Sequence, residues 1–82
     1  MTTLAVDLEP TGPDRTARLV LRGELDMDTA DSVEQAVTQL LSGSPEVLVV
    51  DFAGVAFCDS SGIGALIRAH RSAADQGCRL EL

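Results

Sequence analysis

The sequence predicts an α/β fold, in which a mixed sheet begins with an antiparallel hairpin and continues as a β-α-β-α-β unit with helices packed on the sheet. Two observations support this fold class. Two early segments alternate apolar and polar residues, which is the period of half-buried strands. Later, apolar runs alternate with segments of helical spacing, and strands joined through helices are parallel. Because the chain has 82 residues, near the lower limit for independent folding, we expect residues 1–82 to form a single domain.

The predicted hairpin comes first. Its first strand places three alternating apolar residues on one face: Leu4, Val6 and Leu8. Turn residues at 10–14 end this strand. The second strand, over about residues 16–23, has its arginines on one face and apolar side chains on the other: Ala17, Leu19 and Leu21. A short loop between two alternating runs is typical of an antiparallel hairpin.

The first helix is predicted over residues 29–42, after a loop at 23–28. Its apolar residues recur at helical spacing and form one stripe: Ala30, Val33, Val37, Leu40 and Leu41. Asp28 or Thr29 can cap the start of this helix. Gly43 and Pro45 end it.

The second half of the chain predicts strand, helix and strand. Residues 47–52 form a continuous apolar run, typical of a central strand that is covered on both faces. Residues 53–58 lead from it to a corner. The next helix is predicted over residues 61–76, with Gly77 directly after its end. Its expected inner face consists of Ile63, Leu66, Ile67, His70 and Ala74. Residues 78–82 predict the last strand.

Acidic residues dominate the charge of the chain. There are 13 Asp and Glu residues against 6 basic ones, all of them Arg, and the net charge is -7. Because phosphates are repelled by such a surface, we expect no binding to nucleic acid or to an anionic membrane. No apolar run approaches the length of a membrane span, and no signal peptide is visible, so we expect a cytoplasmic protein. Cys58 and Cys78 are expected to be buried or half-buried thiols.

The segment 59–64, Asp-Ser-Ser-Gly-Ile-Gly, joins the central strand to the second helix. The first turn of a helix has N–H groups without intrahelical partners and partial positive charge, so a hydroxyl there can carry a phosphate. Two interpretations stay open. In one, Ser60 and Ser61 are N-cap residues, and Gly62 and Gly64 allow close packing. In the other, the N-cap uses only one of the two serines, so the second serine has another role. The glycines, which weaken a helix start by about 1 kcal/mol each, then let another molecule approach the backbone.

Three parts of the sequence together resemble the STAS domain, in particular the bacterial anti-sigma factor antagonists. They are Gly-Glu-Leu-Asp at 23–26, the apolar strand that ends at Asp51, and the corner at 59–64. The resemblance implies a STAS-type mixed sheet and a partner-switching cycle that regulates transcription in stress response or sporulation. The unphosphorylated protein would bind an anti-sigma factor that is itself a serine kinase. Phosphorylation would release it, a serine phosphatase would restore it, and no cofactor is implied.

The resemblance also implies roles for residues at the corner. Ser60, directly after the motif aspartate, is the implied phosphoacceptor. The residues expected near it or against the partner are Asp26, Asp59, Ser61, Gly62 and Gly64. A phosphate next to Asp59 adds repulsion and a desolvation cost to an interface. A loss of even ~3 kcal/mol weakens binding by more than about a hundredfold.

Other functions fit the sequence less well. The acidic residues at 24, 26 and 28 lack the glycine and closing glutamate of an EF-hand, and the cysteines and histidine lack zinc-site spacing, so no metal site is predicted. A hydrolase using Ser60 and His70 would need Gly-x-Ser-x-Gly, which is absent, so we expect no catalytic residues and no enzyme. The alternative function is a sensory or scaffolding STAS domain that binds a nucleotide or another small ligand without a phosphorylation cycle.

The end of the chain departs from the family pattern. Members usually continue past the strand near Cys78, whereas this chain stops at Leu82. We therefore expect the C-terminal part of the usual domain to be missing. An uncovered last strand exposes a pairing edge and an apolar face. A homodimer, or aggregation, is then expected more often than in full-length relatives.

Overall fold

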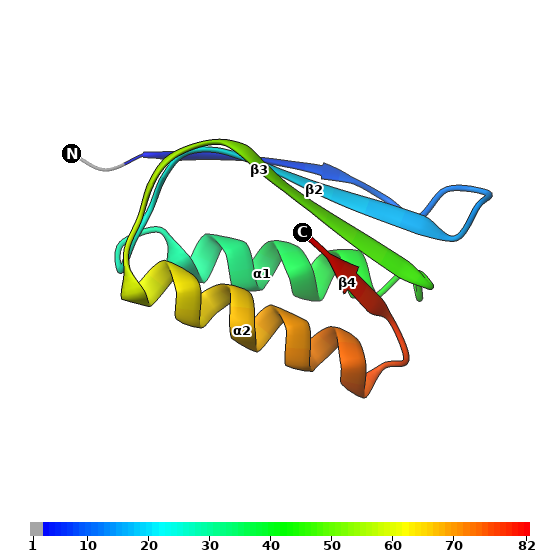
Figure 1. The fold of residues 1–82 in the computed structure, drawn as a ribbon. Helices are drawn as coiled ribbons and strands as arrows, with labels where there is room; N and C mark the ends of the chain where they lie inside the picture. The colour runs from blue at the N-terminus through cyan, green and yellow to red at the C-terminus, as the bar shows by residue number, and fades with distance from the viewer. Residues whose placement is uncertain (1–2) are drawn as a thin grey trace.

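A computed structural model describes residues 3–82 as a four-stranded sheet with helices packed against it (Figure 1). The elements in chain order are β1 (Leu4–Glu9), β2 (Thr16–Leu25), α1 (Ala30–Leu41), β3 (Val47–Cys58), α2 (Ser60–Asp75) and β4 (Arg79–Glu81). The strand order is β1-β2-β3-β4, with β1 antiparallel to β2 and the other two pairs parallel. The predicted mixed sheet with an N-terminal hairpin is confirmed.

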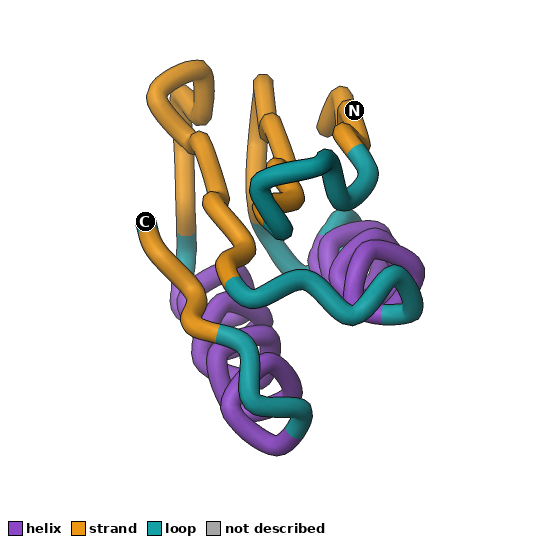
Figure 2. Tube along the Cα trace, turned by 90° about the vertical axis from the view of Figure 1, so that its right-hand side faces the viewer, coloured by secondary structure: helices purple, strands orange, loops and turns teal. Residues whose placement is uncertain are grey.

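Both helices lie on the same face of the sheet (Figures 1 and 2). Along β3, Leu48 and Val50 are buried beneath the helices, whereas Val47 and Val49 on the other face are half-buried. The expectation that this strand is covered on both faces is therefore wrong. The reason is topological. The strands β2, β3 and β4 follow one another in a single direction across the sheet, and two right-handed crossovers in that direction place their helices on one face.

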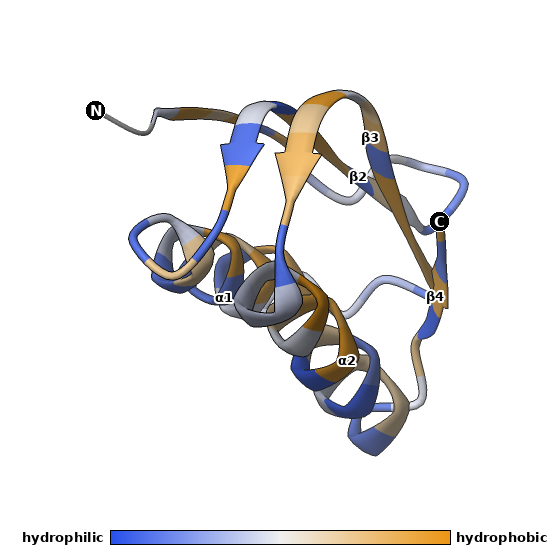
Figure 3. Cartoon of the chain, turned by 60° about the vertical axis from the view of Figure 1, so that its left-hand side comes forward, coloured by the Kyte–Doolittle hydropathy of each residue, from blue (hydrophilic) through white to orange (hydrophobic). Residues whose placement is uncertain are grey.

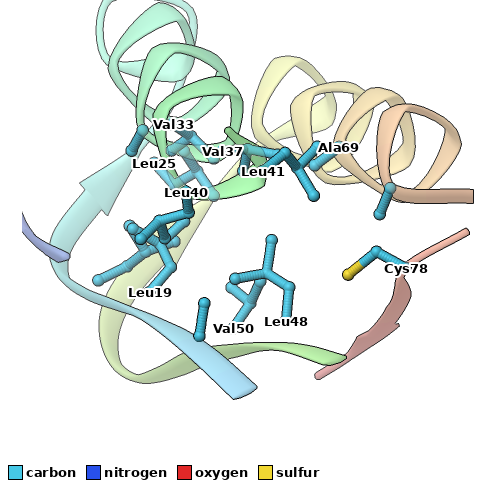
Figure 4. Close-up of a cluster of buried hydrophobic side chains, with 14 residues drawn as sticks. Leu19, Leu25, Val33, Val37, Leu40, Leu41, Leu48, Val50, Ala69 and Cys78 are labelled. Atoms are coloured by element: carbon cyan, nitrogen blue, oxygen red, sulfur yellow. The ribbon is translucent and has the colours of Figure 1, made fainter. Parts of the chain in front are cut away.

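The core lies between this face and the two helices (Figure 4). The apolar face of β2 is confirmed, because Ala17, Leu19 and Leu21 are at most 1% exposed. The predicted stripe of α1 is also confirmed, since all of its members are buried: Ala30, Val33, Val37, Leu40 and Leu41. Large aliphatic side chains thus join the hairpin, α1 and β3 in one cluster.

The helix α2 packs through a different face from the one expected. Its buried residues are all small: Gly62, Ala65, Ala69 and Ala73. On the expected inner face, Ile63 is 53% and Ile67 49% exposed, His70 and Ala74 are exposed, and Leu66 is half-buried. Bulky residues at helical spacing normally mark the inner face of a helix. Here the small residues are on the buried face, and the bulky ones form an outer face.

Two strands extend beyond their predicted ends and pair with each other. The segment 23–25, expected as a loop, continues β2, and 53–58 continues β3, with Leu25 opposite Cys58. Register shifts lie between Val20 and Arg22 and between Gly23 and Glu24. Such irregularities interrupt the two-residue period on which the prediction depended. At Gly23 the backbone has φ +115°, and a Cβ would lie 2.5 Å from the Thr3 carbonyl oxygen, so only glycine fits.

The two cysteines differ in their surroundings. Cys78 is 4% exposed, and burial raises the pKa of its thiol. Cys58 is exposed, which corrects the expectation that it is at least half-buried. In the part of the chain that the structure describes, neither helix is long and apolar enough to cross a membrane.

Candidate functional site

The corner between β3 and α2 is capped by an aspartate. Asp59 is the N-cap residue of α2, and its Oδ1 accepts a hydrogen bond from the Gly62 N–H at 3.1 Å. The Asp59 N–H donates to the Leu25 carbonyl oxygen at 3.2 Å, which ties this corner to the end of β2. The interpretation of Ser60 or Ser61 as the N-cap is therefore wrong. The carboxylate of Asp59 satisfies one of the free N–H groups of the first turn.

Ser60 occupies the first position of α2 and is exposed, whereas the neighbouring Ser61 is half-buried. Because Asp59 provides the cap, the Ser60 hydroxyl is not required for it. A hydroxyl at this position is accessible to another protein and stands where the dipole of a 16-residue helix favours negative charge. The structure thus places an accessible hydroxyl at the N-terminus of a helix.

The two glycines of the corner have different roles. Gly62 is buried, and a Cβ there would lie 2.7 Å from Leu25 Cγ, 2.8 Å from the Leu25 carbonyl oxygen and 2.9 Å from Cys58 Sγ. Its missing side chain lets the helix meet the ends of β2 and β3, which corrects the expectation that it makes room for a partner. At Gly64 the nearest atom to a Cβ would be Arg68 Nη1, at 3.1 Å. Gly64 is half-buried and borders the surface.

A second corner, between β2 and α1, lies beside the first (Figure 3). Its centre is Asp26, which is 9% exposed. The Asp26 Oδ1 accepts from the N–H groups of Asp28 at 2.9 Å and Thr29 at 3.2 Å. Thr29 is the N-cap of α1 but makes no side-chain cap; its hydroxyl donates to the Glu24 carbonyl oxygen at 2.8 Å. The Asp26 side chain therefore holds the start of α1, and Thr29, one of the two expected caps, does not cap it with its side chain.

Both corners carry exposed apolar side chains. Met27 is 76% exposed, and Phe57 and Ile63 are each 53% exposed. We name four exposed residues of the two corners, together with the half-buried Gly64, the corner surface: Met27, Phe57, Ser60, Ile63 and Gly64. Sequence reasoning missed Met27 and Phe57. A large apolar residue in an acidic loop was the signal for Met27, and Phe57 gave none because the extension of β3 was not predicted.

The corner surface combines exposed apolar side chains with the Ser60 hydroxyl. Exposed apolar residues around a polar group are typical of protein interfaces. A phosphate on Ser60 would place about -1.5 to -2 charges within this patch. Among residues 3–82, no group of three or more His, Cys, Asp and Glu side chains is arranged to hold a metal ion.

The fold and these two corners define a two-layer α/β domain, with one layer of sheet and one of helices (Figure 1), that presents a helix N-terminus at its surface. The family model described as "Mlab, STAS domain" matches residues 9–82. The chain therefore belongs to the STAS domain family. No curated protein matches the sequence.

Solved structures of anti-sigma factor antagonists are similar to the chain. One is an anti-sigma factor antagonist from Mycobacterium paratuberculosis, with a TM-score of 0.80 and 26% identity over 95% of this chain and 66% of that one. Another is the Bacillus cell fate determinant SpoIIAA in its phosphorylated form, with a TM-score of 0.75 and 25% identity over 95% of this chain and 70% of that one. The anti-sigma factor antagonist SpoIIAA in its unphosphorylated form has a TM-score of 0.70 and 27% identity over 95% and 68% of the two chains.

Proposed function

We propose that this protein is an anti-sigma factor antagonist that is controlled by phosphorylation of Ser60. In its unphosphorylated form it binds, in the cytoplasm, an anti-sigma factor with serine kinase activity, and the sigma factor is freed. The kinase phosphorylates Ser60 and the complex dissociates. A serine phosphatase reverses the modification, so that transcription in a stress or developmental programme follows the phosphorylation state.

The observation that carries this proposal is the exposed Ser60 at a helix start that another residue already caps. The similarity to structures of SpoIIAA in its phosphorylated and unphosphorylated forms supports the same cycle. A phosphate at the first position of α2 is compatible with the fold, because the N-terminus of a helix stabilises negative charge. The modification is therefore expected to act on the partner and to leave the stability of the domain nearly unchanged.

The corner surface explains how one modification dissociates a complex. A partner seated on Met27, Phe57 and Ile63 would cover Ser60 as well. A buried phosphate without a cationic partner carries a large desolvation cost, and the nearby carboxylates of an acidic protein add repulsion. A loss of ~3 kcal/mol corresponds to an affinity more than about a hundredfold lower.

We propose that the domain binds and does not catalyse. His70 and Ser60 lie on the same helix, ten positions apart, which is about 15 Å along the helix axis. A histidine at that distance does not reach the serine to act as its base, since this needs hydrogen-bond contact.

Capture experiments with paired variants test the proposal. Ser60→Ala bait should retain the anti-sigma factor kinase from a lysate of the source cells, and Ser60→Asp bait should not. The matched control is Ser72→Asp, which places the same charge at an exposed position of the same helix, twelve residues further along, and should retain the kinase. The captured kinase, incubated with ATP and the protein, should modify Ser60, as mapped by mass spectrometry. Equal modification of the Ser60→Ala variant would refute the assignment.

The second candidate function is a domain that binds a nucleotide or another small ligand without a phosphorylation cycle. The observation in its favour is a hollow of about 410 Å³ on the open face of the sheet, whose lining includes Arg18, Phe52 and Leu82. Its volume is within the range of small-molecule sites, which is about 300–1,000 Å³, and Arg18 could contact an anionic group. Calorimetric titration with ATP, ADP and GTP tests it: binding that Arg18→Ala abolishes and Ser60→Ala leaves intact would favour this function.

A further inference from the structure

Three residues connect the start of α2 to an arginine further along the same helix. Ser60, Gly64 and Arg68 recur at intervals of four, and side chains at this spacing are neighbours on a helix surface. Long side chains on a helix point towards its N-terminus. In agreement with this, a Cβ on Gly64 would lie 3.1 Å from Arg68 Nη1 and 3.9 Å from Arg68 Cζ. The Arg68 guanidinium therefore lies over Gly64, on the side of Arg68 that faces Ser60.

The missing side chain at Gly64 leaves this place free for the guanidinium. Glycine within a helix is destabilising relative to alanine. Its backbone does not require glycine here, because the glycines with positive φ among residues 3–82 are Gly23 and Gly77. Close packing against other elements does not require it either, in contrast to Gly62, since the three nearest atoms to a Cβ on Gly64 all belong to Arg68. Room for the arginine side chain is the physical reason that remains.

In the unmodified protein the same guanidinium is paired with α1. Arg68 Nε lies 2.5 Å from Glu34 Oε1, and this ion pair joins the two helices. The side chains are 53% exposed for Arg68 and 34% exposed for Glu34. Water therefore screens the pair, and exposed pairs of this kind contribute little to stability. Arg68 can leave Glu34 at small cost when a more strongly charged anion comes within reach.

We propose that Arg68 is the intramolecular partner of phosphorylated Ser60, and that it exchanges Glu34 for the phosphate when Ser60 is modified. The exchange rests on the phosphorylation cycle proposed above. A phosphoserine carries about -1.5 to -2 charges and three acceptor oxygens, and arginine binds such a group through two parallel N–H groups. Residues four positions apart on a helix have Cβ atoms about 5–6 Å apart. The phosphate thus has to span one helical turn to meet a guanidinium that already lies over Gly64.

The exchange gives the partner a second reason to dissociate. The phosphate and Arg68 form an ion pair over Gly64, which is part of the corner surface. A partner that returned to this surface would have to remove water from both charged groups, which costs free energy. The Glu34 carboxylate loses its arginine and is left in the hollow between the two helices, whose lining includes Val37 and Ala69. One modification thus changes the charges of the corner surface and of the groove beside it.

NMR spectroscopy tests the exchange on a chain that carries phosphoserine at position 60, introduced directly by genetic code expansion. In the unmodified chain Glu34→Gln should shift the Nε–H signal of Arg68, whereas in the phosphoserine chain it should leave this signal nearly unchanged. Phosphorus NMR follows the second pKa of the phosphate. Arg68→Gln should raise that pKa by about half a pH unit or more, because a nearby cation favours the dianion. The carboxylates of both corners and of Glu34 are the same in the two chains, so the difference reports the arginine.

Matched variants separate a direct contact from a general effect of charge. Arg71→Gln removes the same charge from an exposed position of the same helix, about 16 Å along the axis from Ser60, and should leave the phosphate pKa nearly unchanged. Gly64→Leu keeps Arg68 but fills the space over Gly64, so it should raise the pKa as Arg68→Gln does. Circular dichroism checks that every variant is folded.

Two results overturn the proposed exchange. One is an equal change of the phosphate pKa in Arg68→Gln and Arg71→Gln, and the other is an Arg68 Nε–H signal that responds to Glu34→Gln equally with and without the phosphate. Because the phosphoserine is introduced directly, both measurements are independent of any kinase or partner. Failure of the exchange and failure of the proposed function are therefore distinguishable.

Discussion

Replacing Gly62 by alanine tests the packing of the corner that presents Ser60. The new Cβ would lie within 3 Å of three atoms, Leu25 Cγ, the Leu25 carbonyl oxygen and Cys58 Sγ, at 2.7, 2.8 and 2.9 Å. One of these is a backbone atom of a paired strand, which cannot move alone. Overpacking of this kind costs about 1–3 kcal/mol, and three simultaneous contacts indicate the upper part of that range. The better helix propensity of alanine returns at most about 1 kcal/mol.

We therefore expect Gly62→Ala to lower the free energy of unfolding by about 2 kcal/mol, the difference between these two contributions. In a chain of this size that is a fall in Tm of about 8–16 °C. Urea unfolding followed by circular dichroism measures it. Gly64→Ala is the matched control, because its Cβ would meet only the end of the Arg68 side chain, a surface group whose ion pair with Glu34 contributes little. The control should be neutral or stabilised. A Gly62→Ala protein as stable as the parent would refute this account of the corner.

Three further outcomes follow from the packing and the caps. Asp26→Ala should lower the free energy of unfolding by about 1–2 kcal/mol, because two N–H groups lose their acceptor. Urea unfolding measures this change. Asp26→Asn keeps an acceptor oxygen, so its free energy of unfolding should fall less. On α2, Ala69→Leu should destabilise the fold by about 1–3 kcal/mol, because Ala69 is 2% exposed. Ile67→Glu, on the exposed face of the same helix, should change the stability little. Equal losses of stability in the two variants would contradict the observed orientation of α2. Burial raises the pKa of the Cys78 thiol, so above the ordinary value of 9.0 the unfolded chain releases this proton first. Stability should therefore fall as pH rises past that value, and Cys78→Ala should reduce the slope of unfolding free energy against pH.

The fold was predictable where bulky apolar residues carry the packing. The stripe of α1 and the alternating face of β2 consist of Leu and Val side chains, and both were located from their periods alone. The face of α2 was not, because its core contacts use Ala65, Ala69 and Ala73, which carry little hydrophobic signal. α2 packs closely against its neighbours, so only small side chains fit on its buried face. The positions of the neighbouring elements show this requirement, and the sequence pattern does not.

The candidate site was predictable in position but not in the roles of its residues. The spacing located an exposed Ser60 at a helix start, which the geometry bears out. The carboxylates of Asp59 and Asp26 were expected beside the partner, and both serve as acceptors for N–H groups within their own corners. Aspartate and serine are about equally preferred as N-cap residues, so the sequence alone did not decide which residue caps α2. The pairing of the corners required the extended ends of β2 and β3, whose irregular register hides them.

The central claim is that a charge on Ser60 removes a partner from the corner surface while the domain keeps its fold. The most direct measurement is the affinity of the captured anti-sigma factor for the protein phosphorylated at Ser60 and for the unmodified protein, with the free energy of unfolding of both forms. The account predicts an affinity more than about a hundredfold lower for the phosphorylated form, at nearly equal stability. Equal affinities for the two forms, or a phosphorylated form that is unfolded, would contradict it.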